Sequence, residues 1–320
     1  MWHKKFLNQS SKMIVLATLI FFSSCDKDDD TPASTSTITD VVVSGSNFST
    51  LESAVLKANL QTTLSGTGPF TVFAPDDAAF AASGITTTAL NSLTPTQVQS
   101  ILLYHTIPSK ILAADVPAGP NAKVVTASGD SVFVTKNATG VYVNGIKVNT
   151  ADVSAENGVI HTIGRVLMPP AGNIVETAVA SRLDSLVKAV TRATTAPGGD
   201  PSLAGTLSSA KLTVFAPSNT AFTQLLSALG LAKIDDIPVA TLLAVLRYHV
   251  VPNRAFSSDL SNSNLPMLAG GNTIINLTNG TNNNPTITGS GNGGNKSNII
   301  AANIVCRNGV VHLIDRVLIP

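Results

Sequence analysis

The chain has 320 residues, of which 44% are hydrophobic and 12% charged, and its formal net charge is +1. This length predicts two domains of ordinary size, and the composition is that of a globular chain rather than a disordered one. A nearly neutral protein offers no electrostatic footprint for a phosphate backbone, so we expect no nucleic-acid partner.

Residues 1–24 have the pattern of a signal peptide. A basic start, WHKK, precedes the apolar run MIVLATLIFF, which is too short to span a bilayer. The following FSSC ends at Cys25 and resembles a bacterial lipobox. That resemblance implies that Cys25 is acylated and anchors the mature protein to a membrane. The alternative is an ordinary signal peptide cleaved nearby, which would leave Cys25 unmodified.

Residues 25–37 are expected to form a flexible tether. DKDDD follows Cys25 directly, and the polar stretch TPASTSTIT comes next. Lys-Asp-Asp-Asp after a lipidated cysteine resembles the surface-export signal of Bacteroidetes-type lipoproteins. The resemblance implies a lipid-anchored protein on the outer face of the outer membrane.

Three sequence blocks occur twice, in the same order. FTVFAPDDAAF returns as LTVFAPSNTAF, LLYHTIP returns as LRYHVVP, and NGVIHTIGRVLMP returns as NGVVHLIDRVLIP. The period is too long for a solenoid repeat. We therefore predict two tandem homologous domains, residues 38–169 and 171–320, joined by a short linker.

Each copy is predicted to begin with helices around one buried strand. In the first copy Ser49 and Glu52 have capping-box spacing at the start of an amphipathic helix. In the second copy one apolar stripe predicts a matching helix through Val179, Leu183, Leu186, Val187 and Val190. The strand TVFAP follows in both, stopped by proline, and Asp-Asp or Ser-Asn then supply helix N-caps. A further helix ends at the Tyr-His pair.

The second half of each copy alternates apolar and polar residues around turn signals, which predicts antiparallel strands. Each domain is therefore of the α+β class. The second copy carries an Asn/Gly-rich segment, residues 278–298, which we expect to be an exposed loop that buries nothing.

The three blocks resemble those of the fasciclin-like domain: a Thr-Val-Phe-Ala-Pro block, a Tyr-His block after a helix, and an Asn-Gly-Val-(Ile/Val)-His block near the end. The resemblance covers residues 38–320. It implies a wedge-shaped antiparallel β-sandwich of about seven strands with a helical layer in each domain. It also implies cell-surface adhesion or matrix binding without catalysis, toward an extracellular protein or matrix partner.

Carried over to this chain, two motifs are candidate partner-binding sites. The Tyr-His block corresponds to Tyr104, His105, Tyr248 and His249. A second motif, just before the Asn-Gly turn, corresponds to Asp152, Val153, Asn303 and Ile304. Both motifs come from animal members of the family that this chain resembles. The second copy lacks the acid of the second motif, and the residues that flank the motifs in the animal proteins are absent from both copies.

The side chains that could catalyse a reaction or bind a metal are interpreted as structural residues. The matched His161 and His312, like the two Tyr-His histidines, lie in apolar blocks, where a neutral imidazole can hold a buried backbone group. We expect them, with Phe73 and Phe215, to belong to the core. Zinc-ligand spacing, a nucleophile elbow and a phosphate loop are absent from the sequence, so we expect no enzyme, metal or cofactor.

The remaining cysteine, Cys306, aligns with Ala155 and is interpreted as a small buried residue; with Cys25 lipidated, it has no disulfide partner. Two other functions stay open: a glycan-binding or carbohydrate-active surface protein, and a structural spacer without ligand.

Overall fold

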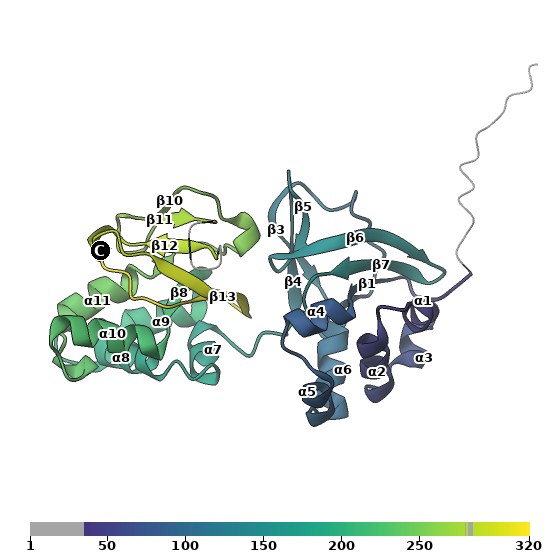
Figure 1. Ribbon diagram of the computed structural model, residues 1–320, viewed down its shortest axis with the longest axis horizontal. Helices are drawn as coiled ribbons and strands as arrows, with labels where there is room; N and C mark the ends of the chain where they lie inside the picture. Colours follow the sequence, from purple (N-terminus) through teal and green to yellow (C-terminus); the bar gives the residue numbers. More distant parts are fainter. Residues whose placement is uncertain (1–34, 279, 281–283) are drawn as a thin grey trace, which may run out of the picture. The chain divides into compact units, whose positions relative to one another are not determined.

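The computed structural model describes residues 35–278, 280 and 284–320 (Figure 1). The described residues belong to one compact unit. The signal peptide, Cys25 and most of the tether lie outside the described residues, so these remain predictions.

The first domain places its helices before and between the first strands and then completes a seven-stranded sheet. Its helices are α1 (Ile38–Ser44), α2 (Ser49–Lys57), α3 (Gln61–Leu64), α4 (Asp77–Ala82), α5 (Thr87–Ser92) and α6 (Pro95–Tyr104). Its strands are β1 (Phe70–Pro75), β2 (Thr106–Ile107), β3 (Gly119–Val125), β4 (Ser131–Asn137), β5 (Gly140–Val143), β6 (Ile146–Ala155) and β7 (Gly158–Ile163).

The second domain repeats this order. Its helices are α7 (Ile174–Ala180), α8 (Asp184–Thr195), α9 (Ser202–Ser209), α10 (Asn219–Leu229) and α11 (Val239–Arg247), with 3₁₀ turns at Ile234–Asp236, Ser257–Asp259 and Ser290–Asn292. Its strands are β8 (Leu212–Pro217), β9 (Val250–Val251), β10 (Asn264–Pro266), β11 (Asn272–Asn276), β12 (Thr286–Thr288), β13 (Ser297–Cys306) and β14 (Gly309–Ile314).

Both sheets have the same topology. The strand orders are β2-β1-β7-β6-β5-β4-β3 and β10-β11-β12-β13-β14-β8-β9. Neighbouring strands are antiparallel, except that β1 pairs with β7, and β8 with β14, in parallel next to the edge strands β2 and β9. This parallel pairing sets Phe73 beside His161 and Phe215 beside His312. In each domain the helices gather on one side of the sheet (Figure 1). The predicted α+β fold of two tandem domains is confirmed.

The repeated strand is buried on both faces, which explains its composition. In β1, Val72 and Ala74 belong to the core between sheet and helices, while Phe73 belongs to a second core enclosed by the strands. In β8, Val214 and Ala216 face the helices and Phe215 the strand-side core. A strand buried on both faces reads as a continuous apolar run rather than an alternating one.

The Asp-Asp and Ser-Asn pairs after these strands cap two helices each. Asp76 accepts the Ala79 N–H at the start of α4, as predicted. Asp77 reaches across to α2, where its carboxylate accepts the N–H groups of Ser49 and Thr50. The predicted Ser49–Glu52 capping box is therefore wrong: α2 has Phe48 at its N-cap, without a side-chain cap. A carboxylate distant in sequence fills the role.

Two further expectations for the second domain are corrected. The predicted helix through Val179 and Leu183 is broken, because α7 ends at Ala180 and Arg182 takes a left-handed φ of 54° before α8 begins. The segment 278–298 is not simply an exposed loop. It contains β12, whose Ile287 is fully buried, and a 3₁₀ turn whose Asn292 side chain binds the backbone of Val317 and Ile319. Residues 279 and 281–283 lie outside the described residues.

Candidate functional site

The Tyr-His histidines join a helix to the chain that follows the last strand of each domain. His105 Nδ1 lies 2.8 Å from the Ile101 carbonyl oxygen in α6, and its Nε2 accepts the Leu167 N–H at 2.9 Å. His249 makes the equivalent contacts with Val245 and Leu318 at 2.8 and 2.9 Å. Because Nε2 accepts, the proton sits on Nδ1 and the ring is neutral. Desolvation lowers the pKa of both histidines to about 4.

The two tyrosines of this block are equally internal. The Tyr104 hydroxyl donates to the Ser131 carbonyl and accepts from the Asn144 side chain. The Tyr248 hydroxyl donates to the Asn272 carbonyl and accepts the Ser290 N–H. All four side chains of the Tyr-His blocks are buried. The expectation that they contact a partner is therefore corrected, because a partner cannot reach them in the folded domain.

The second histidine pair supports a loop that crosses the strand-side core. His161 packs against Phe73 with ring centroids 5.7 Å apart, and His312 stacks on Phe215 at 5.3 Å. His161 Nε2 lies 2.9 Å from the Ile111 carbonyl, and its Nδ1 accepts the Asp152 N–H at 3.1 Å. His312 bonds Ala255 and Asn303 in the same way. All four of these rings are buried, and burial lowers the pKa of His312 to about 4.

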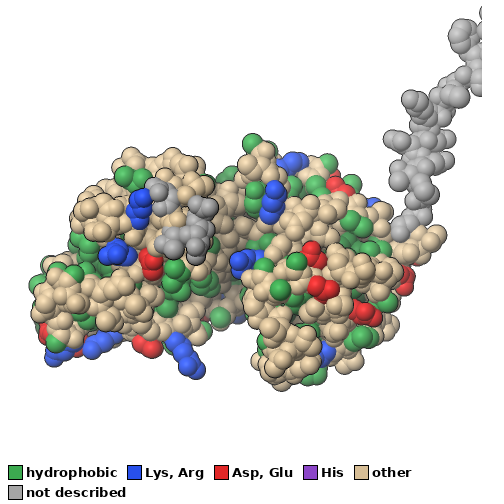
Figure 2. Space-filling model, in the orientation of Figure 1, with side chains coloured by type: hydrophobic (Ala, Val, Ile, Leu, Met, Phe, Trp, Pro, Cys, Tyr) green, Lys and Arg blue, Asp and Glu red, His purple; other side chains and the backbone are tan. Residues whose placement is uncertain are grey.

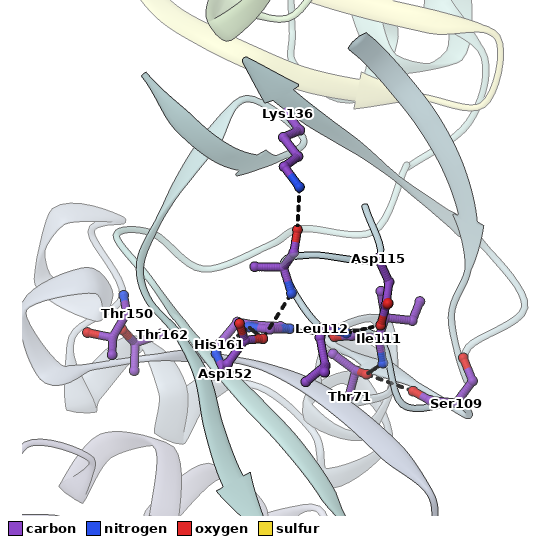
Figure 3. A network of polar contacts seen from close by, with 11 residues as sticks. Thr71, Ser109, Ile111, Leu112, Asp115, Lys136, Thr150, Asp152, His161 and Thr162 are labelled. Atoms are coloured by element: carbon purple, nitrogen blue, oxygen red, sulfur yellow. Dashed lines mark hydrogen bonds and ion pairs between the residues drawn. The ribbon is translucent and has the colours of Figure 1, made fainter. Parts of the chain in front are cut away.

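In the first domain this network ends at an exposed carboxylate (Figure 3). Asp152 sits at a bulge of β6 with a φ of 60°, and its carboxylate accepts the Ala113 N–H at 2.9 Å. Lys136 Nζ donates to the Ala113 carbonyl from β4. Asp115 accepts the Leu112 N–H and so holds the turn of the loop. Val153, the other residue of the predicted motif, is half-buried and packs on the helix-side core.

We call the exposed surface made by residues 110–115, Asp152 and Glu156 the loop face of the first domain. Lys110, Ala114, Asp115, Asp152 and Glu156 are exposed, and Leu112 is half-buried. Beneath the loop lies a cavity of about 220 Å³, lined mainly by aliphatic side chains such as Val124, Val134 and Val148 and by Phe73. The face thus combines carboxylates with access to apolar surface.

The second domain builds the same loop face from residues 254–259, Asn303 and Arg307. Asn303 occupies the equivalent bulge of β13, with a φ of 64°, and accepts the Ser257 N–H at 2.8 Å. Asp259 accepts the Phe256 N–H, as Asp115 does that of Leu112. Ile304 is half-buried and packs on the helix-side core. The two loop faces therefore share one backbone design.

The first domain covers the centre of the loop face of the second domain. Phe256, Val305 and Val310 form an apolar cluster with Phe133 of β4. The guanidinium carbon of Arg254 lies 3.7 Å from the centroid of the Phe133 ring, and Arg254 is itself buried. A cation over an aromatic face in a desolvated setting is a strong contact. Burial lowers the pKa of this guanidinium.

Polar contacts surround this apolar centre. Thr135 Oγ1 donates to Asp259 at 2.9 Å, and Asn137 Nδ2 donates to the Ser258 carbonyl at 3.1 Å. Asn303 Nδ2 donates to the Gly145 carbonyl at 3.4 Å. A Cβ at Gly145 would lie 2.5 Å from Asn303 Nδ2, so glycine permits this approach. We call the surface that contacts the second domain, residues Phe133, Thr135, Asn137 and Gly145, the sheet face of the first domain.

Sequence reasoning missed this interface, although a signal was present. The two loops differ at the positions that contact the other domain. Lys110 and Leu112 of the first copy correspond to Arg254 and Phe256 of the second. Arginine and large aromatic residues are enriched where surfaces meet. A comparison of the two copies, position by position, would have marked the second loop as buried against a partner.

Among the described residues, no group of three or more His, Cys, Asp and Glu side chains is placed to hold a metal ion. Cys306 is buried as expected, its Sγ lies 3.3 Å from Thr177 Oγ1, and burial raises the pKa of its thiol. In the same part of the chain, no helix has the length and hydropathy needed to cross a membrane. Figure 2 shows Lys, Arg, Asp and Glu scattered over the face it presents, in keeping with the low net charge.

Two α+β domains with matching buried histidines and matching loop faces define a tandem protein of the fasciclin type. The family model described as "Fasciclin domain" matches residues 46–169 and 186–320, and the chain belongs to this family.

Several known proteins resemble one domain of the chain. "Protein sll1483" of Synechocystis is 42% identical over 136 residues, which is 42% of this chain and 74% of that protein. A second Synechocystis protein, "Uncharacterized protein sll1735", is 38% identical over 133 residues, which is 41% of this chain and 96% of that protein. "Transforming growth factor-beta-induced protein ig-h3" of Sus scrofa is 34% identical over 135 residues, which is 42% of this chain but only 20% of that protein.

A solved structure, described as a FAS1 domain pair from the insect cell adhesion molecule Fasciclin I, covers 84% of this chain and 92% of its own. Its TM-score is 0.39 and its sequence identity 18%.

Proposed function

We propose that this chain is a non-enzymatic adhesion or binding lipoprotein of the cell surface, whose loop face on the first domain binds an extracellular protein or matrix partner. One observation carries the proposal. The same loop face, built on the same backbone, already serves as a protein-binding surface in the second domain, while its counterpart in the first domain is exposed. Membership of the fasciclin-domain family supports the proposal.

The chemistry of the face suggests what it binds. The three acids Asp115, Asp152 and Glu156 outnumber the one exposed base, Lys110, and Leu112 with the cavity beneath it offers apolar contact. A protein segment with an apolar side chain beside a basic one is complementary to both features. A glycan is less well served, because sugar rings stack on exposed aromatic faces, and Tyr104 and Tyr248 are in the core.

Binding can be tested with residues 35–320 on an array of extracellular proteins and glycans. The informative variant is Asp152→Asn, because Asn303 occupies the equivalent bulge with the same φ and the same accepted hydrogen bond. The variant removes the charge and keeps the fold. We expect it to weaken protein binding several-fold, while Asp184→Asn, an exposed acid on α8, leaves binding unchanged. Undiminished binding by Asp152→Asn, or binding only to glycans, would count against the proposal.

The membrane anchor in this proposal comes from the sequence alone. Cys25→Ser in the full-length chain should move the protein from the membrane fraction to the medium, and mass spectrometry should find an acylated N-terminal cysteine in the unsubstituted protein. Retention of the Cys25→Ser protein in membranes would contradict the lipid anchor. If a membrane-impermeant reagent does not label the unsubstituted protein on intact cells, the outer-face location is contradicted.

A further inference from the structure

The contact between the two domains uses different surfaces of the same fold. The loop face of the second domain meets the sheet face of the first. Such a heterologous contact does not close on itself. Each domain has one loop face and one sheet face, and the contact within the chain uses one of each. The loop face of the first domain and the sheet face of the second domain are therefore left exposed.

The sheet face of the second domain can be located by register. Tyr104 bonds the carbonyl of Ser131 and Tyr248 that of Asn272, so Ser131 corresponds to Asn272 at the start of β4 and β11. Phe133 then corresponds to Ile274, and Thr135 to Asn276. Gly145 precedes β6 by one residue, as Lys296 precedes β13, and these two strands pair with identical bulges.

The exposure of these residues matches their places. Phe133 is 8% exposed because the second domain covers it, whereas Ile274, at the equivalent position, is 57% exposed. Lys296 is exposed and Asn276 is half-buried. Single exposed aliphatic residues are common on protein surfaces, so the weight of Ile274 comes from its register with Phe133, the residue at the centre of the buried contact.

The two exposed faces are complementary at three positions of the buried contact, although the Arg254–Phe133 contact and the Arg307–Asp130 ion pair have no counterpart at Ile274 and Gly271. The apolar contact of Phe256 with Phe133 corresponds to a pairing of Leu112 with Ile274, which are also both apolar. Asp259, which accepts from Thr135, becomes Asp115 opposite the Asn276 amide, again an acceptor and a donor. Asn303 at Gly145 becomes Asp152 near Lys296, an opposite-charge pair.

We propose that the loop face of the first domain binds the sheet face of the second domain of another copy, so that the chain assembles head to tail. This names a partner for the loop face and in that respect rests on the proposed function. The contact lacks the Arg254 and Phe256 anchors and the short linker of the internal one, so it is weaker. Lipid anchoring in one membrane plane would raise the local concentration at which it acts.

Site-directed cross-linking tests the geometry. Within residues 35–320 the native cysteine, Cys306, is buried. We expect a mixture of Leu112→Cys and Ile274→Cys proteins to form disulfide-linked dimers in at least about tenfold higher yield than either protein alone, because only the mixture brings the two positions together. Circular dichroism and melting curves check that both variants are folded. Equal yields in the single-variant samples, or none in the mixture, would overturn the proposal.

Sedimentation velocity tests the energetics on residues 35–320, over concentrations up to about the millimolar values that tethering produces. The weight-average mass should rise with concentration. Ile274→Asn should abolish the rise, while Leu229→Asn, a matched exposed leucine at the end of α10, should not. A chain that stays monomeric throughout, or equal loss in the Leu229 control, would overturn the proposal.

The charge pair is tested by a double-mutant cycle. Lys296→Glu should weaken association about tenfold in the native background, through repulsion from Asp152, and have a much smaller effect in an Asp152→Asn background. Equal effects in both backgrounds would refute the pairing. Array binding that depends on Asp152 without any self-association would end this inference and leave the proposed function standing; loss of that dependence would end the proposed function.

Discussion

Arg254 of the second domain lies over the ring of Phe133 in the first, with 3.7 Å between its guanidinium carbon and the ring centroid. Its Nη2 also donates to the Arg307 carbonyl at 3.1 Å. The side chain therefore holds its own loop in shape and anchors that loop on the neighbouring domain. A single residue thus couples the fold of one domain to the position of the other.

Removing this anchor should loosen the pair of domains. Arg254→Ala takes away the cation over Phe133 and leaves the Arg307 carbonyl without its donor, so we expect a cost of about 2–4 kcal/mol at the interface. Differential scanning calorimetry should show the two domains melting at more widely separated temperatures. The matched change is Lys110→Ala, at the exposed equivalent position, which should cost less than about 0.5 kcal/mol. Identical traces for the two variants would contradict the anchoring role.

Phe73 and Phe215 should be costly to truncate. They are 4% and 0% exposed, and each lies in a strand-side core against a histidine ring. Phe73→Ala or Phe215→Ala should lower the free energy of unfolding by about 3–5 kcal/mol, because a large cavity is left. Urea denaturation measures the loss. The cavity under the first loop already relaxes the packing around Phe73, so Phe215→Ala should be the more damaging change; the reverse order would argue against that reasoning.

The asparagines of the two Asn-Gly turns each tie three backbone groups together. The Asn157 side chain accepts the Ile38 N–H and donates to the carbonyls of Leu64 and Gly66. Asn308 does the same for Ile174, Leu207 and Ala210. Each thus fastens the first helices of its domain to the end of its sheet.

Asn157→Ala or Asn308→Ala should cost about 3 kcal/mol, since buried backbone groups lose their partners. Asn157→Asp keeps the acceptor but exchanges the two donated bonds for a charge, and it should be at least as destabilising. Hydrogen exchange at the Ile38 or Ile174 amide should accelerate in the corresponding variant. Unchanged protection of these amides would show that the side chain does not hold the helices.

The elements of the fold that could be predicted from the sequence are those whose signals lie in neighbouring residues. The strand around Phe73 was predictable, because proline, β-branched residues and an N-cap residue adjoin it. The parallel pairing of β1 with β7 has no local signature, and neither does the capping of α2 by Asp77, which comes from a distant residue. Asn292 is a second example of an effect of distant residues. The Asn/Gly-rich composition around it predicts an exposed loop, yet tertiary contacts bury part of this segment.

The candidate site was harder to predict than the fold, because residue type does not reveal exposure. The resemblance made Tyr104 and His105 candidate partner-binding residues, and in the structure they are core residues. Asp152 was among the expected residues and is exposed, whereas its counterpart Asn303 is engaged by the neighbouring domain. Tertiary placement, which gave two homologous positions different surroundings, could not be read from either copy alone.

The buried histidines should make the protein sensitive to acid. His105, His249 and His312 have pKa values lowered from 6.5 to about 4 by desolvation. Between these values the unfolded chain binds protons that the folded chain does not, so stability rises with pH in this window. The contribution of each histidine is fully present above pH 6.5 and is lost as the pH falls toward 4, by about 3 kcal/mol per group.

NMR titration provides the measurement: the ring C–H resonances of these three histidines should not shift between pH 8 and about 5. Urea midpoints should fall over the same interval, and more for the second domain, which holds two of the three groups. In His249→Gln, whose amide oxygen can still accept the Leu318 N–H, the pH dependence of that domain should flatten by about 1.4 kcal/mol per pH unit. A folded-state titration of His249 near pH 6.5 would show that its Nε2 is not engaged as the structure has it.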